Sequence, residues 1–218
     1  MDTNPFEELA ARGAWRADGP LTPSILGSLA EINELTLELL AARASRESAL
    51  PGRPPLLVDL GELWRAQTPL QRRRLAHCPY LLIDAGFADL TRWSARAPEV
   101  RDSDASWFGG EEGVRLAGLV MIYAWHVARM HRPAARLLLG MSDDCASLIA
   151  SMTVRQLGDC LERASYWIRP RWAERAGVWR HLLVAAATQD DARFEQVRLR
   201  GLQLMASEVW QADRGWRR

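Results

Sequence analysis

The chain has 218 residues, 48% of them hydrophobic, so its length and composition suit one large domain with an ample core. Its 28 basic and 27 acidic residues nearly balance, which excludes a global field that would attract nucleic acid or an anionic membrane. The three widely spaced cysteines, the acidic start and the lack of a membrane-spanning apolar run predict a cytoplasmic protein with free thiols and no signal peptide.

The helix-start and helix-stop signals predict an all-α, multi-helical single domain over residues 20–212. Residues 1–19 are predicted to form a flexible arm, and residues 213–218 a tail. Thr22 followed by Pro23 opens a first helix that runs to about Ala49, before the proline-rich stretch that starts at Pro51. Further helices are predicted over residues 56–65, 68–77, 114–131, 134–139, 174–187 and 189–212.

Two stretches between these helices lack a clear helical pattern. Leu81-Leu82-Ile83 has the composition of a strand, but no second strand is evident to pair with it, so we predict a short helix there. Residues 96–113 are polar and contain three glycines, which predicts a loop and the best candidate for mobility.

The stretch from Pro133 to Trp172 organises the second half of the chain. Gly140 supplies the left-handed residue that commonly ends a helix. Ser142, with two acids behind it, suits the start of the next helix, and Thr153 starts another in the same way. Two short helices joined by a tight, capped turn predict a helix-turn-helix-like unit.

This stretch carries a pattern that is also seen in a known family. It reads Leu-Gly-apolar-Ser, two acids, an alanine, apolar positions and Thr-apolar-x-Gln-apolar. The match covers residues 134–172, and a second one covers residues 24–43. The chain thereby resembles the FlhD family of flagellar transcriptional activator subunits. An insertion, residues 51–132, separates two parts that are nearly continuous in the family. The residues that carry the resemblance are Leu139, Gly140, Met141, Ser142, Asp143, Asp144, Ala146, Ile149, Ala150, Met152, Thr153, Val154, Gln156 and Leu157, with Ile32, Asn33, Leu39, Leu40, Ala41 and Arg43 upstream.

The resemblance implies a bacterial transcription regulator. Such a subunit acts in a homo- or hetero-oligomer with an FlhC-like partner, binds promoter DNA and helps place RNA polymerase. The leucine stripe of the first helix is the predicted oligomer interface, through Ile32, Leu35, Leu39 and Leu40. The predicted DNA contacts are arginines: Arg155, Arg163, Arg169, Arg171 and Arg175.

The arginine prediction has a structural alternative. Arg169 and Arg171 flank Pro170, and in an extended backbone residues two apart share a face, so both could meet one phosphate surface. Alternatively, Arg171 pairs with an internal acid such as Glu174 or Glu162 and serves stability. The tryptophans between these arginines are equally consistent with an interface and with a core.

The sequence predicts no catalytic site, metal site or cofactor. It contains no C-x-x-C, H-E-x-x-H or G-x-S-x-G pattern, and no glycine-rich phosphate loop after a strand. The alternative to a regulator is therefore a helical adaptor or accessory protein of a secretion or motility apparatus, which binds only protein. Exposed, coplanar arginines would favour the regulator, and a large apolar groove without a basic rim would favour the adaptor.

Overall fold

The computed structural model describes residues 21–46, 54–93, 107–108 and 110–215. The predicted arm, residues 1–19, lies outside these ranges, as do residues 47–53, 94–106 and 216–218. Most of the described residues are helical and two very short strands complete the structure, so the predicted all-α class is confirmed. In chain order the elements are α2 (Pro23–Arg46), α3 (Pro55–Val58), α4 (Gly61–Ala66), α5 (Pro69–Ala76), β1 (Ile83–Asp84), α6 (Leu90–Trp93), α7 (Gly110–Met130), α8 (Arg132–Leu139), α9 (Asp143–Ser151), α10 (Val154–Trp167), β2 (Arg169–Pro170), α11 (Ala176–Ala187) and α12 (Asp191–Gly215).

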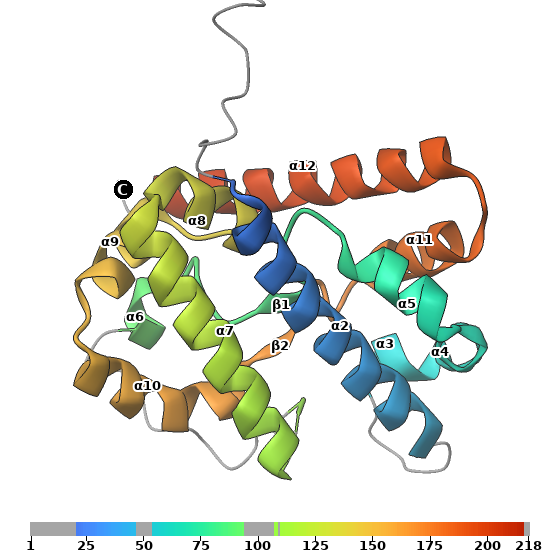
Figure 1. Cartoon of the computed structure of the whole chain (residues 1–218), viewed down its shortest axis with the longest axis horizontal. Coiled ribbons are helices and arrows are strands. Elements are labelled where there is room, and N and C mark those ends of the chain that lie inside the picture. Colours follow the sequence, from blue (N-terminus) through green and yellow to red (C-terminus); the bar gives the residue numbers. More distant parts are fainter. Residues whose placement is uncertain (1–20, 47–53, 94–106, 109, 216–218) are drawn as a thin grey trace, which may run out of the picture.

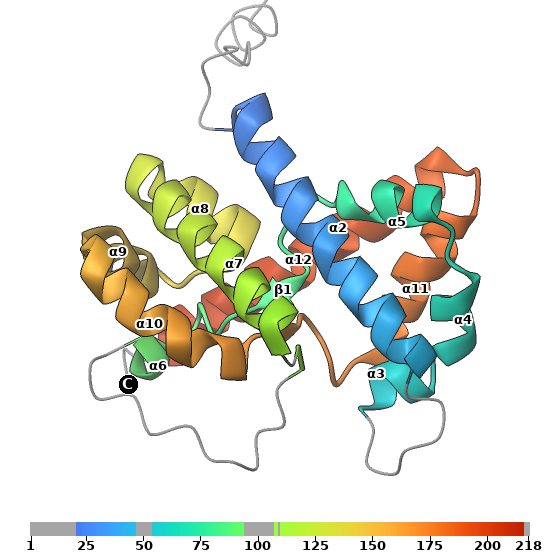
Figure 2. The ribbon, with the colours of Figure 1, turned by 60° about the horizontal axis from the view of Figure 1, so that its bottom comes forward.

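The helices lie in two groups on either side of the strands (Figure 1). One group contains α6 to α10 and the other contains α3, α4, α5 and α11, as the second view also shows (Figure 2). Helix α2 runs between them, antiparallel to α7, and α12 extends along one edge to touch both α8 and α11. A single cluster of buried apolar side chains reaches from Leu29 in α2 to Met205 in α12.

The predicted helix starts are made by side-chain caps. The hydroxyl of Thr22 accepts from the amide of Ile25, and that of Ser142 accepts from the amide of Cys145. Thr68 and Thr153 each form a capping box with the glutamine three residues on. Since each cap depends on residues close in sequence, these starts could be recognised without tertiary information.

The segment around Leu82 corrects a prediction, because it is extended rather than helical. Residues Ile83 and Asp84 form strand β1, which pairs antiparallel with Arg169 and Pro170 in β2. The pairing joins segments more than eighty residues apart in sequence, and the partner strand is too short and too polar to be recognised by its pattern.

Several boundaries also differ from the predictions. The helix predicted over residues 56–65 is divided into α3 and α4. Helix α7 begins at Gly110, within the predicted loop 96–113, where Glu111 and Glu112 suit the positive end of the helix dipole. Helix α12 continues to Gly215, so the predicted tail 213–218 begins inside a helix.

Helices α8, α9 and α10 occupy the stretch that carries the family-like pattern. Helix α8 ends at Gly140, whose φ of 69° is left-handed as predicted, and the Gly140 amide donates to the carbonyl of Arg136. Met152 and Thr153 are extended and separate α9 from α10. The end of α8 at Gly140 and the starts of α9 and α10 after Ser142 and Thr153 agree with the prediction, whereas α8 begins at Arg132, two residues before the predicted start. The helix-turn-helix-like unit itself stays a prediction.

Candidate functional site

Arg171 is the most deeply buried of the five predicted arginines, with only 5% of its surface exposed. Its Nε donates to the carbonyl of Leu81 at 2.9 Å. Its Nη2 donates to the carbonyls of Ile83 at 3.1 Å and Leu139 at 2.7 Å. The guanidinium therefore joins the segment before β1 to the last residue of α8 from inside the molecule.

The backbone of Arg171 is tied down as well. Its amide donates to the carbonyl of Leu82 at 2.8 Å, and its carbonyl accepts from the indole nitrogen of Trp179 at 2.6 Å. Burial lowers the pKa of Arg171, while the charges of Asp84 and Glu208 act in the opposite direction. Arginine nevertheless stays protonated in proteins, so the structure holds a cation among carbonyl oxygens.

The prediction that Arg171 contacts DNA is therefore wrong, because its guanidinium is enclosed and engaged by three carbonyl groups. The alternative of a stabilising role fits the structure better, but the partners differ from those predicted. Backbone carbonyls take the place of an internal acid such as Glu174, whose nearest arginine is Arg169 at 3.7 Å.

Two further predicted arginines, Arg169 and Arg175, line a cleft of about 270 Å³ together with Arg171. Arg169 contacts the carboxylates of Asp84 at 3.4 Å and Glu174 at 3.7 Å. Arg175 contacts the carboxylate of Glu208 at 3.3 Å. Three acidic residues line the cleft together with the three arginines, so its formal charge is balanced and it presents no basic surface.

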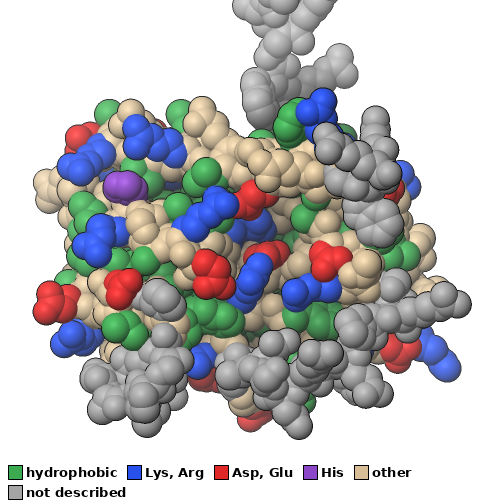
Figure 3. Space-filling view, turned by 180° about the vertical axis from the view of Figure 1, so that it is seen from behind, with side chains coloured by type: hydrophobic (Ala, Val, Ile, Leu, Met, Phe, Trp, Pro, Cys, Tyr) green, Lys and Arg blue, Asp and Glu red, His purple; other side chains and the backbone are tan. Residues whose placement is uncertain are grey.

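The remaining two predicted arginines lie on α10. Arg155 is exposed near the start of the helix, whereas Arg163 is half-buried and its Nη2 lies 3.5 Å from the sulfur of Cys160. The face opposite to that of Figure 1 shows acidic and basic side chains interspersed with apolar ones (Figure 3). The structure thus brings together Arg169, Arg171 and Arg175 and leaves Arg155 and Arg163 on a separate element.

The predicted oligomer interface on α2 also needs correction. Ile32 and Leu40 are 5% and 0% exposed and belong to the chain's own core, so the interface prediction is wrong for these two residues. Leu35 and Leu39 are half-buried and pack against that core. The leucine stripe of α2 faces inward, because this side of the helix packs against α4, α5 and α7.

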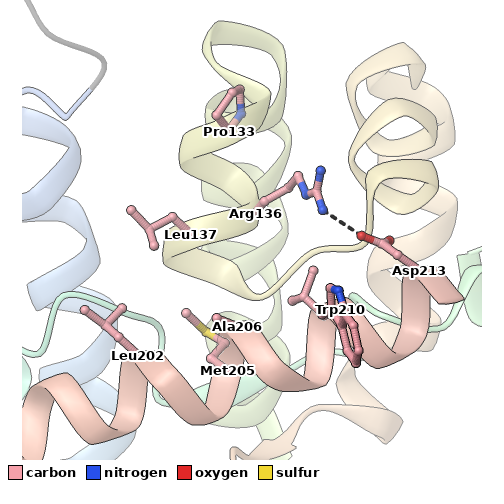
Figure 4. A pocket seen from close by; sticks show the side chains of 9 residues that line it. Pro133, Arg136, Leu137, Leu202, Met205, Ala206, Trp210 and Asp213 are labelled. Atoms are coloured by element: carbon pink, nitrogen blue, oxygen red, sulfur yellow. Dashed lines mark hydrogen bonds and ion pairs between the residues drawn. The ribbon is translucent and has the colours of Figure 1, made fainter.

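An apolar hollow with a volume of about 400 Å³ lies between α8 and α12 (Figure 4). Helix α8 provides one wall and the second half of α12 provides the other. We call this the α8–α12 groove. Its lining residues are Pro133, Arg136, Leu137, Leu202, Met205, Ala206, Val209, Trp210 and Asp213.

Two large apolar side chains of the groove stand open to solvent. Leu137 is 46% exposed and Trp210 is 57% exposed, whereas Met205 and Val209 are buried beneath them. The guanidinium of Arg214 lies 4.0 Å from the centre of the Trp210 ring. An exposed tryptophan beside an apolar hollow is typical of a protein-binding surface.

One end of the groove is closed by ion pairs. Arg136 Nη2 lies 2.6 Å from a carboxylate oxygen of Asp213 (Figure 4). Arg136 Nη1 lies 3.5 Å from a carboxylate oxygen of Asp143. Asp213 also accepts from the backbone amide of Asp143 at 3.3 Å. The charged residues that line the groove are this one arginine and this one aspartate, so its rim is not basic.

The sequence prediction did not single out the groove residues. A usable signal was present on α12, where Leu202, Met205, Ala206 and Val209 recur at three- and four-residue steps and Trp210 lies just beside that stripe. Part of this stripe is buried by packing inside the molecule, and part of it is exposed to solvent. Only the placement of the short helix α8 against α12 decides which side chains remain exposed.

The chemistry of the other polar clusters is limited. Among the described residues no three histidine, cysteine or acidic side chains lie close enough together to hold a metal ion. The three cysteines are free and buried; burial raises the pKa of Cys78 to about 12 and that of Cys145 to about 11. The thiols of Cys78 and Cys145 therefore stay protonated at neutral pH and are poor nucleophiles.

No protein-family model, curated protein or solved structure matches this chain. Within the described residues, every helix is too short or too polar to cross a membrane.

Proposed function

We propose that this chain is a helical protein-binding adaptor and that the α8–α12 groove is its binding site. The observation that carries the proposal is the apolar groove itself, about 400 Å³ in volume, with Trp210 and Leu137 exposed on it. An apolar trough between two helices suits the apolar face of an amphipathic helix from a partner protein. Trp210, large and half open to solvent, would be the anchor of such an interface.

The charges favour a protein partner over DNA. Arg169 and Arg175 contact carboxylates, and Arg171 is enclosed, so the predicted arginine cluster offers a phosphate backbone little net charge. The groove carries one basic and one acidic residue, paired with each other at 2.6 Å. Neither surface has the excess of exposed basic side chains by which proteins hold DNA.

A transcription regulator of the FlhD type is a narrower form of the same proposal. In that form the helix in the groove belongs to an FlhC-like subunit, and the assembled pair contacts promoter DNA. Its support is the sequence pattern over residues 24–43 and 134–172, together with the exposed Arg155 on α10.

The groove is tested first by site-specific photo-crosslinking in cells that make the full chain. A photoreactive phenylalanine analogue at Trp210 should crosslink one partner protein, identified by mass spectrometry. The same analogue at Leu70, which is 76% exposed on α5 and remote from the groove, is the matched control (Figure 1). A protein captured equally from both positions would not be a groove partner.

Binding of the purified partner then gives the decisive measurement. Trp210→Ala should weaken binding by about 2 kcal/mol, or roughly 30-fold, as expected for a central tryptophan. Leu70→Ala should leave the affinity unchanged. An unchanged affinity in Trp210→Ala would reject the groove as the binding site.

A separate measurement of DNA binding tests the regulator form. Promoter binding by the purified pair is measured at two salt concentrations for wild type, Trp210→Ala and Arg155→Ala. If Arg155 contacts phosphate, its loss should weaken binding to all sequences about equally and lower the log-log salt slope by about one. If the pair binds no DNA, only the adaptor form remains.

A further inference from the structure

Helix α7 presents a regular row of exposed side chains on the side away from the core. The row consists of Arg115, Leu119, Ile122, His126 and Arg129, and all five are exposed. Leu119 and Ile122 are 43% and 54% exposed, although they lie in the middle of a largely apolar helix. The steps between neighbours alternate between four and three residues, which is the spacing of the contact positions in a helix-to-helix seam.

Helix α2 carries a second row with the same spacing. It consists of Ser24, Ser28, Glu31, Leu35 and Glu38, of which Ser24, Glu31 and Glu38 are exposed and the other two are half-buried. Leu35, one of the predicted interface residues, therefore belongs to the open side of the helix as well as to the edge of the core.

The two rows lie side by side on one face of the molecule. Ser28 and Glu31 from α2 and Leu119, Ile122 and His126 from α7 line a shared hollow of about 260 Å³. The hydroxyl of Tyr123 donates to the carbonyl of Ile25 at 3.0 Å. Tyr123 and Ile25 therefore lie at nearly the same height along the two helices. The helices are antiparallel, as both ribbon views show (Figures 1 and 2). We call this surface the α2–α7 face.

On the α2–α7 face, acids predominate on α2 and bases on α7. The acids Glu31 and Glu38 lie on the α2 row, and the bases Arg115 and Arg129 lie on the α7 row, which is preceded by one exposed acid, Glu112, in the first turn of the helix. Within the part of the chain that the structure describes, Glu31, Glu38 and Arg115 take part in none of the ion pairs within 4 Å. The α2 edge of the face is therefore acidic, while the α7 edge carries two bases and one acid, with Leu119 and Ile122 between the two bases.

We propose that the α2–α7 face binds a second copy of this chain and forms an antiparallel four-helix bundle. A two-fold axis parallel to the helices packs α2 of one copy against α7 of the other. This rotation leaves each residue at the same height along the axis. The acidic α2 edge of each copy then meets the mainly basic α7 edge of the other. A surface with this arrangement of charges is complementary to itself.

The levels of the charges support this pairing. At 1.5 Å per residue, Arg115 lies about 12 Å along α7 from Tyr123. Glu31 and Glu38 lie about 9 Å and about 20 Å along α2 from Ile25 in the same direction. Arg115 of one copy therefore comes level with the stretch between Glu31 and Glu38 of the other copy, within reach of both carboxylates.

The size of the face is sufficient for a dimer. Two helices about 30 Å long, lying side by side, offer on the order of 600 Å² per copy, at the lower end of stable protein interfaces. We therefore expect a reversible dimer whose population rises with protein concentration. This dimer does not depend on the α8–α12 groove, which shares no lining residue with the α2–α7 face.

The full chain is measured by analytical ultracentrifugation over a wide range of concentrations. Wild type should rise from 24.5 kDa towards twice that mass as the concentration increases. Ile122→Arg should keep the mass at that of the monomer, because it puts a charge at the centre of the apolar row. Leu70→Arg, a matched change at an exposed leucine on α5, should dimerise as wild type does. Circular dichroism shows that each variant is folded.

Charge reversal separates this two-fold arrangement from a less specific association. The α7 variant is Arg115→Glu, and the α2 double variant combines Glu31→Arg with Glu38→Arg. Each should be monomeric alone, because like charges then face each other. An equimolar mixture of the two variants should form a heterodimer, since both contacts are again between opposite charges. The proposal is overturned if wild type stays monomeric at hundreds of micromolar, if Ile122→Arg dimerises, or if the mixture stays monomeric.

Discussion

Arg171 illustrates how one side chain can act as an internal connector. A guanidinium has five donors in a rigid, planar arrangement, and here it serves the carbonyls of Leu81, Ile83 and Leu139. Those carbonyls have few other donors available, since they lie at the end of a helix and beside a strand of two residues. The cation supplies the hydrogen bonds that a longer sheet would otherwise make.

Removing this guanidinium should be severely destabilising. Arg171→Met keeps much of the volume but leaves buried carbonyls without donors, at about 1–3 kcal/mol each, so we expect a loss of about 3–5 kcal/mol. Arg171→Lys should lose most of this as well, because an ammonium cannot reach three acceptors in that geometry. Urea unfolding followed by tryptophan fluorescence measures the change in the free energy of unfolding.

The matched control for Arg171→Met is Arg169→Met, two residues away. Arg169 is partly exposed and contacts Asp84 and Glu174 at 3.4 and 3.7 Å, so its loss should cost less than about 1 kcal/mol. Similar losses in both variants would show that the internal hydrogen bonds of Arg171 contribute little.

At the scale of the element, the end of α8 brings several parts of the molecule together. Gly140 is left-handed, and a Cβ atom placed there would lie 2.9 Å from Nη1 of Arg171 and 2.9 Å from Cγ of Met205. The glycine is therefore needed both for its backbone conformation and for the close approach of α12. The leucine that precedes it, Leu139, supplies one of the carbonyls that Arg171 binds.

Gly140→Ala should therefore lower the free energy of unfolding by about 1–3 kcal/mol. Gly158→Ala is the control, because Gly158 lies within α10 with open space around it and is not left-handed. There alanine should stabilise by about 0.5–1 kcal/mol through its better helix propensity. Equal melting temperatures for the two variants would mean that α8 ends without strain and α12 can move away.

At the scale of the whole molecule, the extended segments at the centre hold the two groups of helices together. The amide of Leu81 donates to the carbonyl of Leu138, and that of Leu82 donates to the side chain of Asn33 in α2. The amide of Arg171 donates to the carbonyl of Leu82. Elements from both halves of the chain thus meet at these few buried residues.

We expect these central amides to exchange with solvent only when the whole molecule unfolds. In hydrogen exchange followed by mass spectrometry, peptides that cover residues 80–84 and 169–172 should be the slowest, since the amides of Leu81, Leu82 and Arg171 are hydrogen-bonded across the molecule. Peptides from α10, which lies at one edge with many exposed residues, should exchange sooner. Equal protection of α10 and the centre would instead indicate one cooperative unit without a more stable centre.

The amino-acid sequence by itself determined the helical class and most of the helix ends. Thr22, Thr68, Ser142 and Thr153 cap their helices, and Gly140 ends one, through contacts with residues only a few positions away. Such local contacts can be read from spacing alone, because the chain geometry within one helical turn is nearly fixed.

The tertiary structure decided which side chains face the solvent, and with that the candidate sites. Arginines at 169 and 171 have the same local pattern, yet one is exposed and the other is enclosed by carbonyls from two distant segments. Leu40 and Ile122 are both apolar residues of long helices, yet only Ile122 lies open on the α2–α7 face. The physical reason is that burial depends on which distant elements cover a residue, and the periodicity of a single helix does not contain that information.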